Sequence, residues 1–247
     1  MRMQMHMRMR MQMQMRMRMH PPNKPKEPTN PMSNPSTQPM LDPRSLAKHG
    51  PVIPVIVLQR LQDAVPLAEA LLAGGVKVLE VTLRTPAALA GIEAIARALP
   101  EAIVGAGTVR TPADAQAARD AGSLFAVSPG YTAEVGQACA AAGLPLLPGV
   151  ATASEVMAAM AGGHQFLKFF PAVQAGGVAM LKALGGPFPD LQFCPTGGLT
   201  QDTAPQYLAL PQVVVCGGSW LTPADAVAEG DWARITALAK ASHLLRS

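Results

Sequence analysis

The chain has 247 residues, of which 49% are hydrophobic and 15% charged, a balance that suits a compact α/β domain better than a disordered or fibrous chain. The net charge is +4, but residues 1–40 hold seven of the 20 Lys/Arg and only one of the 16 acids, so residues 41–247 carry −2. A near-neutral domain gives no basis for nucleic-acid binding, and the lack of any run of 18 apolar residues excludes a transmembrane helix.

The N-terminal stretch is a simple repeat. Residues 1–19 place Met at every odd position, with only Arg or Gln or His between. A repeated ATG-CRN hexanucleotide encodes all of these residues, so we interpret the stretch as a translated DNA repeat upstream of the natural start. The alternating polar residues leave no apolar core for a secretory signal. Cu(I) binding by the thioethers with His6 and His20 is a weaker alternative.

A polar linker follows this repeat. Residues 21–40 are rich in Pro, Asn, Ser and Thr, a composition that buries too little apolar surface to fold. We therefore predict that residues 1–40 form a disordered, low-complexity tail, with Met32 and Met40 as candidate natural starts.

From residue 51 onward, β-branched segments alternate with Ala-rich segments of helical period. The expected strands are Val52–Leu58, Val76–Leu83, Ile103–Val109, Leu124–Val127, Leu144–Leu147, Phe166–Phe170, Leu191–Cys194 and Val213–Cys216. The expected helices include Ala64–Leu72, Ala87–Ala98, Ala113–Asp120 and Ala133–Ala141. Eight such units predict a single α/β domain over residues 41–247, a (β/α)8 TIM barrel. An open, doubly wound sheet is the alternative, although no GxGxxG motif follows the first strand.

The second expected strand carries a carboxylate on its inner face. Strand alternation places Val78, Glu80 and Thr82 on one face, which Arg84 extends. A buried carboxylate is costly unless it has a partner, so we expect Glu80 inside the barrel beside a cation or a bound substrate. A purely structural ion pair of Glu80 with Arg84 or Lys168 is the alternative.

The third expected strand ends in Gly105, Gly107 and Thr108. Glycine at a strand end allows a ligand or another backbone to approach closely, and the Thr108 hydroxyl would then reach a substrate oxygen. The alternative is an ordinary turn at the end of a strand.

Lys168 lies in the run 165–171, which reads as a short buried strand of apolar and aromatic residues closed by a proline. Burying an ammonium group there is costly unless it is paired or loses its proton. A neutral lysine is a nucleophile that forms Schiff bases with ketones. The alternative is a strand-end lysine whose charged group reaches water.

Two glycine pairs follow the last two expected strands. Gly197 and Gly198 come after Thr196, and a second pair ends at Gly218, directly before Ser219. Because TIM barrels often bind phosphate through the loops after strands seven and eight, these pairs predict a phosphate site.

The sequence has no metal-site motif. Its three cysteines are widely spaced and predict buried free thiols in a reducing compartment, and its histidines form no HExxH or similar pattern. We therefore expect a mechanism that uses no metal and no cofactor.

Taken together, these stretches resemble the 2-keto-3-deoxy-6-phosphogluconate aldolase family from about Pro51 to Arg246, and the tail has no counterpart there. The resemblance rests on six stretches in matching order: 79–85 (LEVTLRT), 105–109 (GAGTV), 128–130 (SPG), 168–172 (KFFPA), 193–198 (FCPTGG) and 217–220 (GGSW).

The resemblance implies a class I aldolase of the Entner–Doudoroff pathway that often also acts on 4-hydroxy-2-oxoglutarate. Lys168 would be the Schiff-base lysine and Glu80 the general acid and base. The other matched positions would bind substrate: Arg84, Thr108 and Thr196 the keto-acid end, and Gly197, Gly198, Gly218 and Ser219 the phosphate. A related family that acts on the galactonate analogue differs at the position of Arg84, which favours the gluconate substrate.

The resemblance also implies a cytoplasmic homotrimer. Two alternatives stay open from the sequence. One is an aldolase acting mainly on 4-hydroxy-2-oxoglutarate, and the other is a non-catalytic barrel that binds a phosphorylated sugar.

Overall fold

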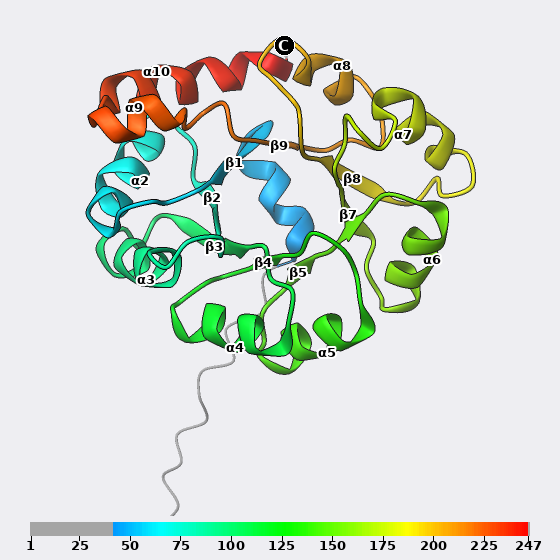
Figure 1. Cartoon of the computed structure of the whole chain (residues 1–247). Coiled ribbons are helices and arrows are strands. Elements are labelled where there is room, and N and C mark those ends of the chain that lie inside the picture. Colours follow the sequence, from blue (N-terminus) through cyan, green and yellow to red (C-terminus); the bar gives the residue numbers. More distant parts are fainter. Residues whose placement is uncertain (1–41, 247) are drawn as a thin grey trace, which may run out of the picture. The chain divides into compact units, whose positions relative to one another are not determined.

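Parallel strands run around a central axis, with helices on the outside, in the computed structural model, which describes residues 42–246 (Figure 1). The strands are β1 (Val52–Ile56), β2 (Val78–Thr82), β3 (Ile103–Gly107), β4 (Ala126–Val127), β5 (Leu146–Leu147), β6 (Gly149–Val150), β7 (Phe166–Phe169), β8 (Gln192–Pro195) and β9 (Cys216–Gly218). The predicted tail, residues 1–40, lies outside the described residues.

Nine α-helices and three short 3-10 helices connect the strands within residues 42–246. The α-helices are α2 (Ala64–Ala73), α3 (Ala88–Ala98), α4 (Pro112–Asp120), α5 (Ala133–Ala141), α6 (Ala153–Ala161), α7 (Gly177–Gly185), α8 (Ala204–Leu208), α9 (Ala224–Glu229) and α10 (Trp232–Ser242). The 3-10 helices are η1 (Pro43–His49), η2 (Leu61–Asp63) and η3 (His243–Arg246). None of the described helices is long and apolar enough to cross a bilayer.

The strands close into the predicted eight-stranded barrel. β5 pairs with β4, whereas β6, two residues further on, pairs with β7, so the two segments together form one side of the ring. Pro148 lies between them and has no backbone N–H, so it interrupts the ladder. Between β8 and β9 the ring is closed by isolated bridges, Phe193 with Val213 and Thr196 with Gly217.

Seven of the eight expected strands overlap the observed ones closely, and the eighth is displaced toward the C-terminus. It was expected at Val213–Cys216 but forms at Cys216–Gly218, because the ladder with β1 begins where Cys216 pairs with Val52. The preceding valines are largely buried without forming a regular strand. The short strand β6 was not predicted.

Side-chain caps fix where four of the α-helices begin, namely α4, α5, α6 and α10. In α4, Thr111 accepts a hydrogen bond from the Asp114 backbone N–H, and the Asp114 carboxylate accepts one from the Thr111 N–H. Thr152 and Glu155 form the same capping box at α6, and Thr132 caps α5. Such caps satisfy backbone groups that have no partner within a helix, so these helix starts are encoded locally.

Strand alternation separates two sides of the barrel wall. Leu79 and Val81 of β2 face outward and pack with helix residues such as Ile92 in one hydrophobic cluster. Val78 of the same strand belongs to a separate interior cluster with residues of β4, β7 and other strands. Leu46 of η1, which crosses the centre of the barrel in Figure 1, also joins that interior cluster. The helix η1 therefore closes the amino-terminal end of the barrel, and the carboxyl-terminal end is left for a site.

Candidate active site

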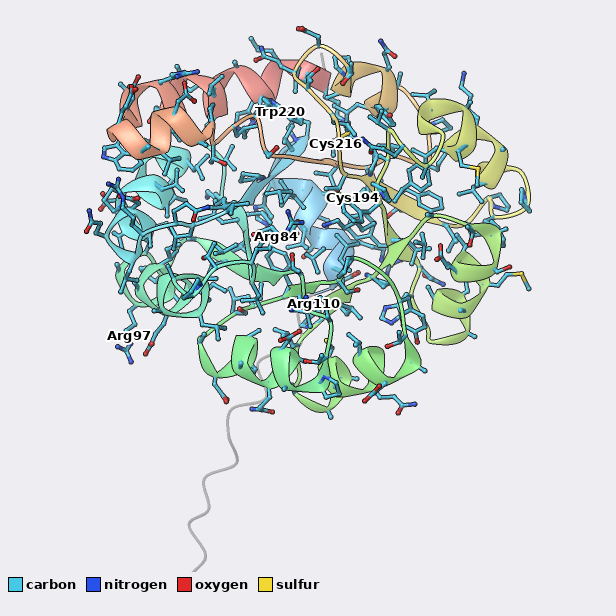
Figure 2. All side chains as sticks on the ribbon, in the orientation of Figure 1. Arg84, Arg97, Arg110, Cys194, Cys216 and Trp220 are labelled. Carbon is cyan, nitrogen blue, oxygen red and sulfur yellow. The ribbon has the colours of Figure 1, made fainter. Side chains whose placement is uncertain are left out.

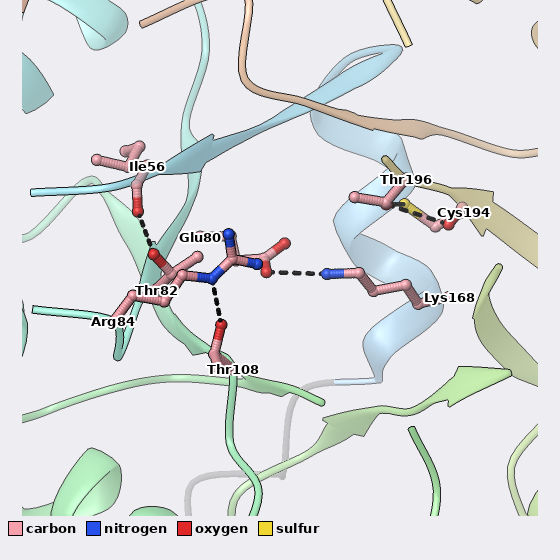
Figure 3. Close-up of polar contacts among 8 residues, drawn as sticks. All are labelled: Ile56, Glu80, Thr82, Arg84, Thr108, Lys168, Cys194 and Thr196. Carbon is pink, nitrogen blue, oxygen red and sulfur yellow. Dashed lines mark hydrogen bonds and ion pairs between the residues drawn. The ribbon is translucent and has the colours of Figure 1, made fainter. Parts of the chain in front are cut away.

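A buried ion pair crosses the interior of the barrel. Glu80 of β2 and Lys168 of β7 point toward one another, and the Lys168 Nζ donates to the Glu80 Oε1 at 3.1 Å (Figure 3). Both side chains are 4% exposed. The inward orientation predicted for both residues is confirmed, and the alternative of a lysine reaching water is wrong.

Aromatic carbon and strand backbone surround the lysine. The Phe170 ring centroid lies 5.2 Å from the Lys168 Nζ, within the range of a cation–π interaction. The register of β7 and β8 sets Lys168 beside Cys194, whose burial raises the pKa of its thiol to about 12. The thiol is thus protonated at neutral pH, and the Glu80 carboxylate supplies the charge that balances the ammonium.

A second polar pair lies where β2 and β3 end. Arg84, two residues after β2, donates its Nε–H to the Thr108 Oγ1 at 3.1 Å (Figure 3). Thr108 has φ 62°, an uncommon value for a threonine, and such strained backbone is found at functional sites more than elsewhere. Arg84 lies over the middle of the barrel in Figure 2, whereas Arg97 points away from the outer helices and pairs with Glu93.

Thr196, the first residue after β8, is buried close to the lysine side of the barrel. Its hydroxyl donates to the Cys194 carbonyl at 3.3 Å and lies 3.8 Å from the Cys194 Sγ. The backbone bridge between Thr196 and Gly217 joins β8 to β9. Thr196 therefore lies between the buried ion pair and the two glycine pairs.

Both residues of the first glycine pair have a positive φ. Gly197 has φ 101° and Gly198 has φ 79°, values that residues with side chains rarely adopt. Glycine also allows a ligand to approach the backbone closely. The predicted phosphate role of this loop therefore stays a prediction that the local geometry favours.

Gly218 has a different reason to be glycine. A Cβ added at Gly218 would collide with the ring of Trp220, so the space beside this residue is already filled. Similarly, a Cβ at Gly105 would meet Phe125, and one at Gly107 would meet Glu80. The expectation that Gly105 and Gly107 make room for a ligand is therefore wrong: they make room for neighbouring side chains.

A cavity of about 200 Å³ opens among these groups at the carboxyl ends of the strands. Seven of the nine predicted site residues line it: Arg84, Lys168, Thr196, Gly197, Gly198, Gly218 and Ser219. The other two are in contact with lining residues, Glu80 with Lys168 and Thr108 with Arg84. The structure thus brings all nine together from β2, β3, β7, β8 and β9.

Several apolar residues that line this cavity were not predicted from the sequence. They are Val55, Val57, Phe170 and Leu199. Strand alternation was an available signal for three of them, because Val55 and Val57 follow Ile53 on the inner face of β1 and Phe170 comes two residues after Lys168.

Two other cavities lack a buried lysine. One of about 460 Å³ adjoins the site, sharing Val55, Val57 and Ser219 with it, and contains the Arg60–Asp63 ion pair. The other, of about 260 Å³, lies at the amino-terminal end beside Arg44 and His164. No group of three or more potential metal ligands lies together anywhere in residues 42–246.

Comparisons with known proteins show which sequences and structures this chain resembles. A family model described as "Aldolase: KDPG and KHG aldolase" matches residues 44–238. A 2-dehydro-3-deoxy-phosphogluconate aldolase of Pseudoalteromonas atlantica is 53% identical over 191 residues, which cover 77% of this chain and 89% of that protein. A KHG/KDPG aldolase of Escherichia coli is 52% identical over 196 residues, 79% of this chain and 92% of that protein.

A crystal structure shows the same similarity in three dimensions. A KDPG aldolase from Legionella pneumophila is 47% identical and matches with a TM-score of 0.81, over 82% of this chain and 98% of that one. In that crystal, pyruvate is captured at low pH as a covalent carbinolamine intermediate.

Proposed function

The chain belongs to the KDPG and KHG aldolase family, and from that premise we propose that it is a class I aldolase of the Entner–Doudoroff pathway. It cleaves 2-dehydro-3-deoxy-6-phosphogluconate to pyruvate and glyceraldehyde 3-phosphate. One observation carries the proposal: the Lys168 Nζ lies 3.1 Å from the Glu80 carboxylate beside a cavity at the carboxyl ends of the strands. A lysine in that position is suited to form a Schiff base with a keto acid.

Lys168 acts as the nucleophile in this proposal. Glu80 accepts a proton from the lysine, whose free amine adds to the C2 ketone of the substrate. Glu80 then gives this proton to the carbinolamine hydroxyl, which leaves as water, so that an iminium ion forms on Lys168 and Glu80 is again a carboxylate. Its positive nitrogen attracts the electrons of the C3–C4 bond, and the adjacent carboxylate stabilises the charge that develops.

Glu80 then acts as the general base. Directly or through a water molecule, it removes the proton of the C4 hydroxyl, the C3–C4 bond breaks, and glyceraldehyde 3-phosphate leaves. The electron pair of that bond forms an enamine on Lys168. Protonation at C3 and hydrolysis of the resulting iminium release pyruvate and restore the amine.

The remaining predicted residues bind the two ends of the substrate. Arg84, Thr108 and Thr196 hold the keto-acid end, a role supported by the hydrogen bond between Arg84 and Thr108 at the edge of the cavity. The loops containing Gly197, Gly198, Gly218 and Ser219 hold the phosphate, a role supported by their place along the cavity wall. No metal ion or cofactor takes part in this proposed cycle.

A second activity is cleavage of 4-hydroxy-2-oxoglutarate to pyruvate and glyoxylate, because the Escherichia coli relative is named for both substrates. The test is pyruvate release from each substrate, coupled to lactate dehydrogenase. We expect release from both, with the larger kcat/KM on the phosphorylated one. A larger kcat/KM on 4-hydroxy-2-oxoglutarate would favour the alternative aldolase, and release from neither would favour a non-catalytic barrel that binds a phosphorylated sugar.

We also propose that the enzyme works as a homotrimer in the cytoplasm. The trimer follows from the family resemblance, and light scattering of the purified protein should give three times the chain mass. A monomer or dimer at all concentrations would contradict it. The cytoplasm is supported by the cysteines of residues 42–246, all three of which are buried and unpaired as expected in a reducing compartment.

A further inference from the structure

Gly107 lies directly beside the side chain of Glu80. It is the last residue of β3, and its strand partner in β2 is Thr82, two residues after Glu80. A Cβ added at Gly107 would lie 2.7 Å from the Glu80 Cγ and 3.0 Å from the Cδ, and closer still to Oε1. The volume that any side chain at position 107 needs is therefore occupied by the Glu80 carboxylate.

We propose that Gly107 is a positioning residue for the proposed aldolase reaction: its lack of a side chain lets the Glu80 carboxylate reach Lys168. This inference rests on the proposed function. The strands leave little freedom to relieve a collision, because the Leu83 N–H donates to the Gly107 carbonyl at 2.8 Å and five residue pairs join β2 to β3. A side chain at position 107 therefore displaces the carboxylate rather than the strand.

The backbone itself does not require glycine at this position. Gly107 is part of a regular strand and lies outside the left-handed φ range that excludes other residues. An alanine fits the same backbone, so the collision with Glu80 is the main effect of the substitution. Gly105, two residues earlier in the same strand, offers a matched control because its added Cβ would lie 2.5 Å from Phe125 ring carbons instead.

The experiment is Gly107→Ala, assayed on 2-dehydro-3-deoxy-6-phosphogluconate. A misplacement of about 1 Å costs on the order of 100-fold in rate, so we expect kcat to fall about 10- to 100-fold while KM stays close to that of the parent. Borohydride with pyruvate should still modify Lys168, because the nucleophile keeps its place.

A double-mutant cycle separates positioning from a general structural role. In a Glu80→Ala background the colliding side chain is absent, so Gly107→Ala should cause no further loss of kcat or melting temperature. If Gly107→Ala alone does not fold, recovery of folding in the double variant supports the proposal, and failure to recover contradicts it. An equal fold-loss of kcat in both backgrounds, or an unchanged kcat in the single variant, also contradicts it.

Gly105→Ala provides the control for crowding alone. It should lower the melting temperature and leave the kcat of the folded enzyme near the parent value. A fall of kcat as large as that of Gly107→Ala would contradict a specific role for Gly107. Failure of the proposed function would look different, because the parent enzyme itself would then neither release pyruvate from the substrate nor be trapped by pyruvate at Lys168.

Discussion

Two layers of side chains fill the interior of the barrel, and the same segments of the barrel wall contribute to both. In each of four segments, the residue of the lower layer is apolar or a thiol, and the inward residue two positions later belongs to the upper layer. The lower members are Val78, Phe166, Cys194 and Val215, and the corresponding upper members are Glu80, Lys168, Thr196 and Gly217. In these segments, the first inward residue thus packs in the core, and the inward residue two positions later faces the proposed site.

The difference between the layers shows how the barrel separates stability from function. In the lower layer, Leu46 of η1 completes an apolar cluster, and each fully buried aliphatic or aromatic side chain contributes about 1.5–3 kcal/mol. In the upper layer, two charged groups are withdrawn from water, an arrangement that is rarely retained for stability alone. The first layer holds the strands at fixed spacing, and the second uses that spacing to hold a carboxylate against a lysine.

The largest effect should come from removing the charge of Glu80. We expect Glu80→Gln to lower turnover by about 10²- to 10⁴-fold, because a lost general acid or base usually costs that much. The circular dichroism spectrum should stay that of the parent, and Lys168 should still be trapped by pyruvate. Near-normal kcat would reduce Glu80 to a structural partner of the lysine.

The matched control for that variant is Glu93→Gln. Glu93 also pairs with a cation, Arg97, but on the surface, where the two side chains are 46% and 79% exposed. Exposed pairs contribute little, so neither turnover nor melting temperature should change measurably.

In the lower layer, Phe125→Ala should act on stability instead. The Phe125 side chain is fully buried, and losing a buried phenylalanine costs about 3–5 kcal/mol of unfolding free energy. Urea denaturation measures this loss, and kcat at low temperature should stay close to the parent value. Leu124→Ala, at a neighbouring residue that is 44% exposed, should change neither. A kcat loss comparable to that of Glu80→Gln would show that the two layers are not separable.

The phosphate end should respond more weakly. Ser219→Ala removes one hydroxyl from the cavity, and a hydrogen bond to a charged group contributes about 1.5–3 kcal/mol, so KM for the phosphorylated substrate should rise about 10- to 100-fold. The KM for 4-hydroxy-2-oxoglutarate should not change, because that substrate has no phosphate. Equal increases for both substrates would contradict a phosphate role. Gly218→Val is a poor test, since its side chain would collide with Trp220.

The smallest effect should come from shortening the chain. Both layers lie within the barrel, so a protein that begins at Met40 should match the full chain in kcat/KM and melting temperature. Enzyme kinetics and differential scanning calorimetry on the two proteins provide the comparison. A clear decrease in either quantity would show that residues 1–39 contribute to the folded enzyme.

Much of this arrangement was predictable, because strand alternation and buried charge are properties of local sequence. Strand alternation predicted that Glu80 points into the barrel, and the aromatic residues around Lys168 predicted that this lysine is buried. The positions of both members of the ion pair were therefore predictable from two short segments of sequence. The two glycine loops that we propose bind phosphate were located by their order along the chain. The apolar lining of the cavity was not identified, because a residue such as Leu199, which lies in a loop, has neither a reactive group nor a strand position that marks it.

The features that were missed depend on contacts between distant segments. The last strand begins at Cys216 because its hydrogen-bond partner is the segment at Val52, which the valine pattern does not reveal. Likewise, the glycine at position 107 was expected to admit a ligand, and only the folded structure shows that Glu80 fills the space. Sequence patterns identify which residues are unusual, but the neighbour across the barrel decides their role.

The most direct test of the central claim is to reduce the enzyme with borohydride in the presence of pyruvate and map the modified peptide. The account predicts loss of activity together with the mass of one reduced pyruvate on the peptide that contains Lys168, and no such loss without pyruvate. Modification at Lys77 or Lys182, or full activity after treatment, would contradict the assignment of Lys168 as the Schiff-base lysine.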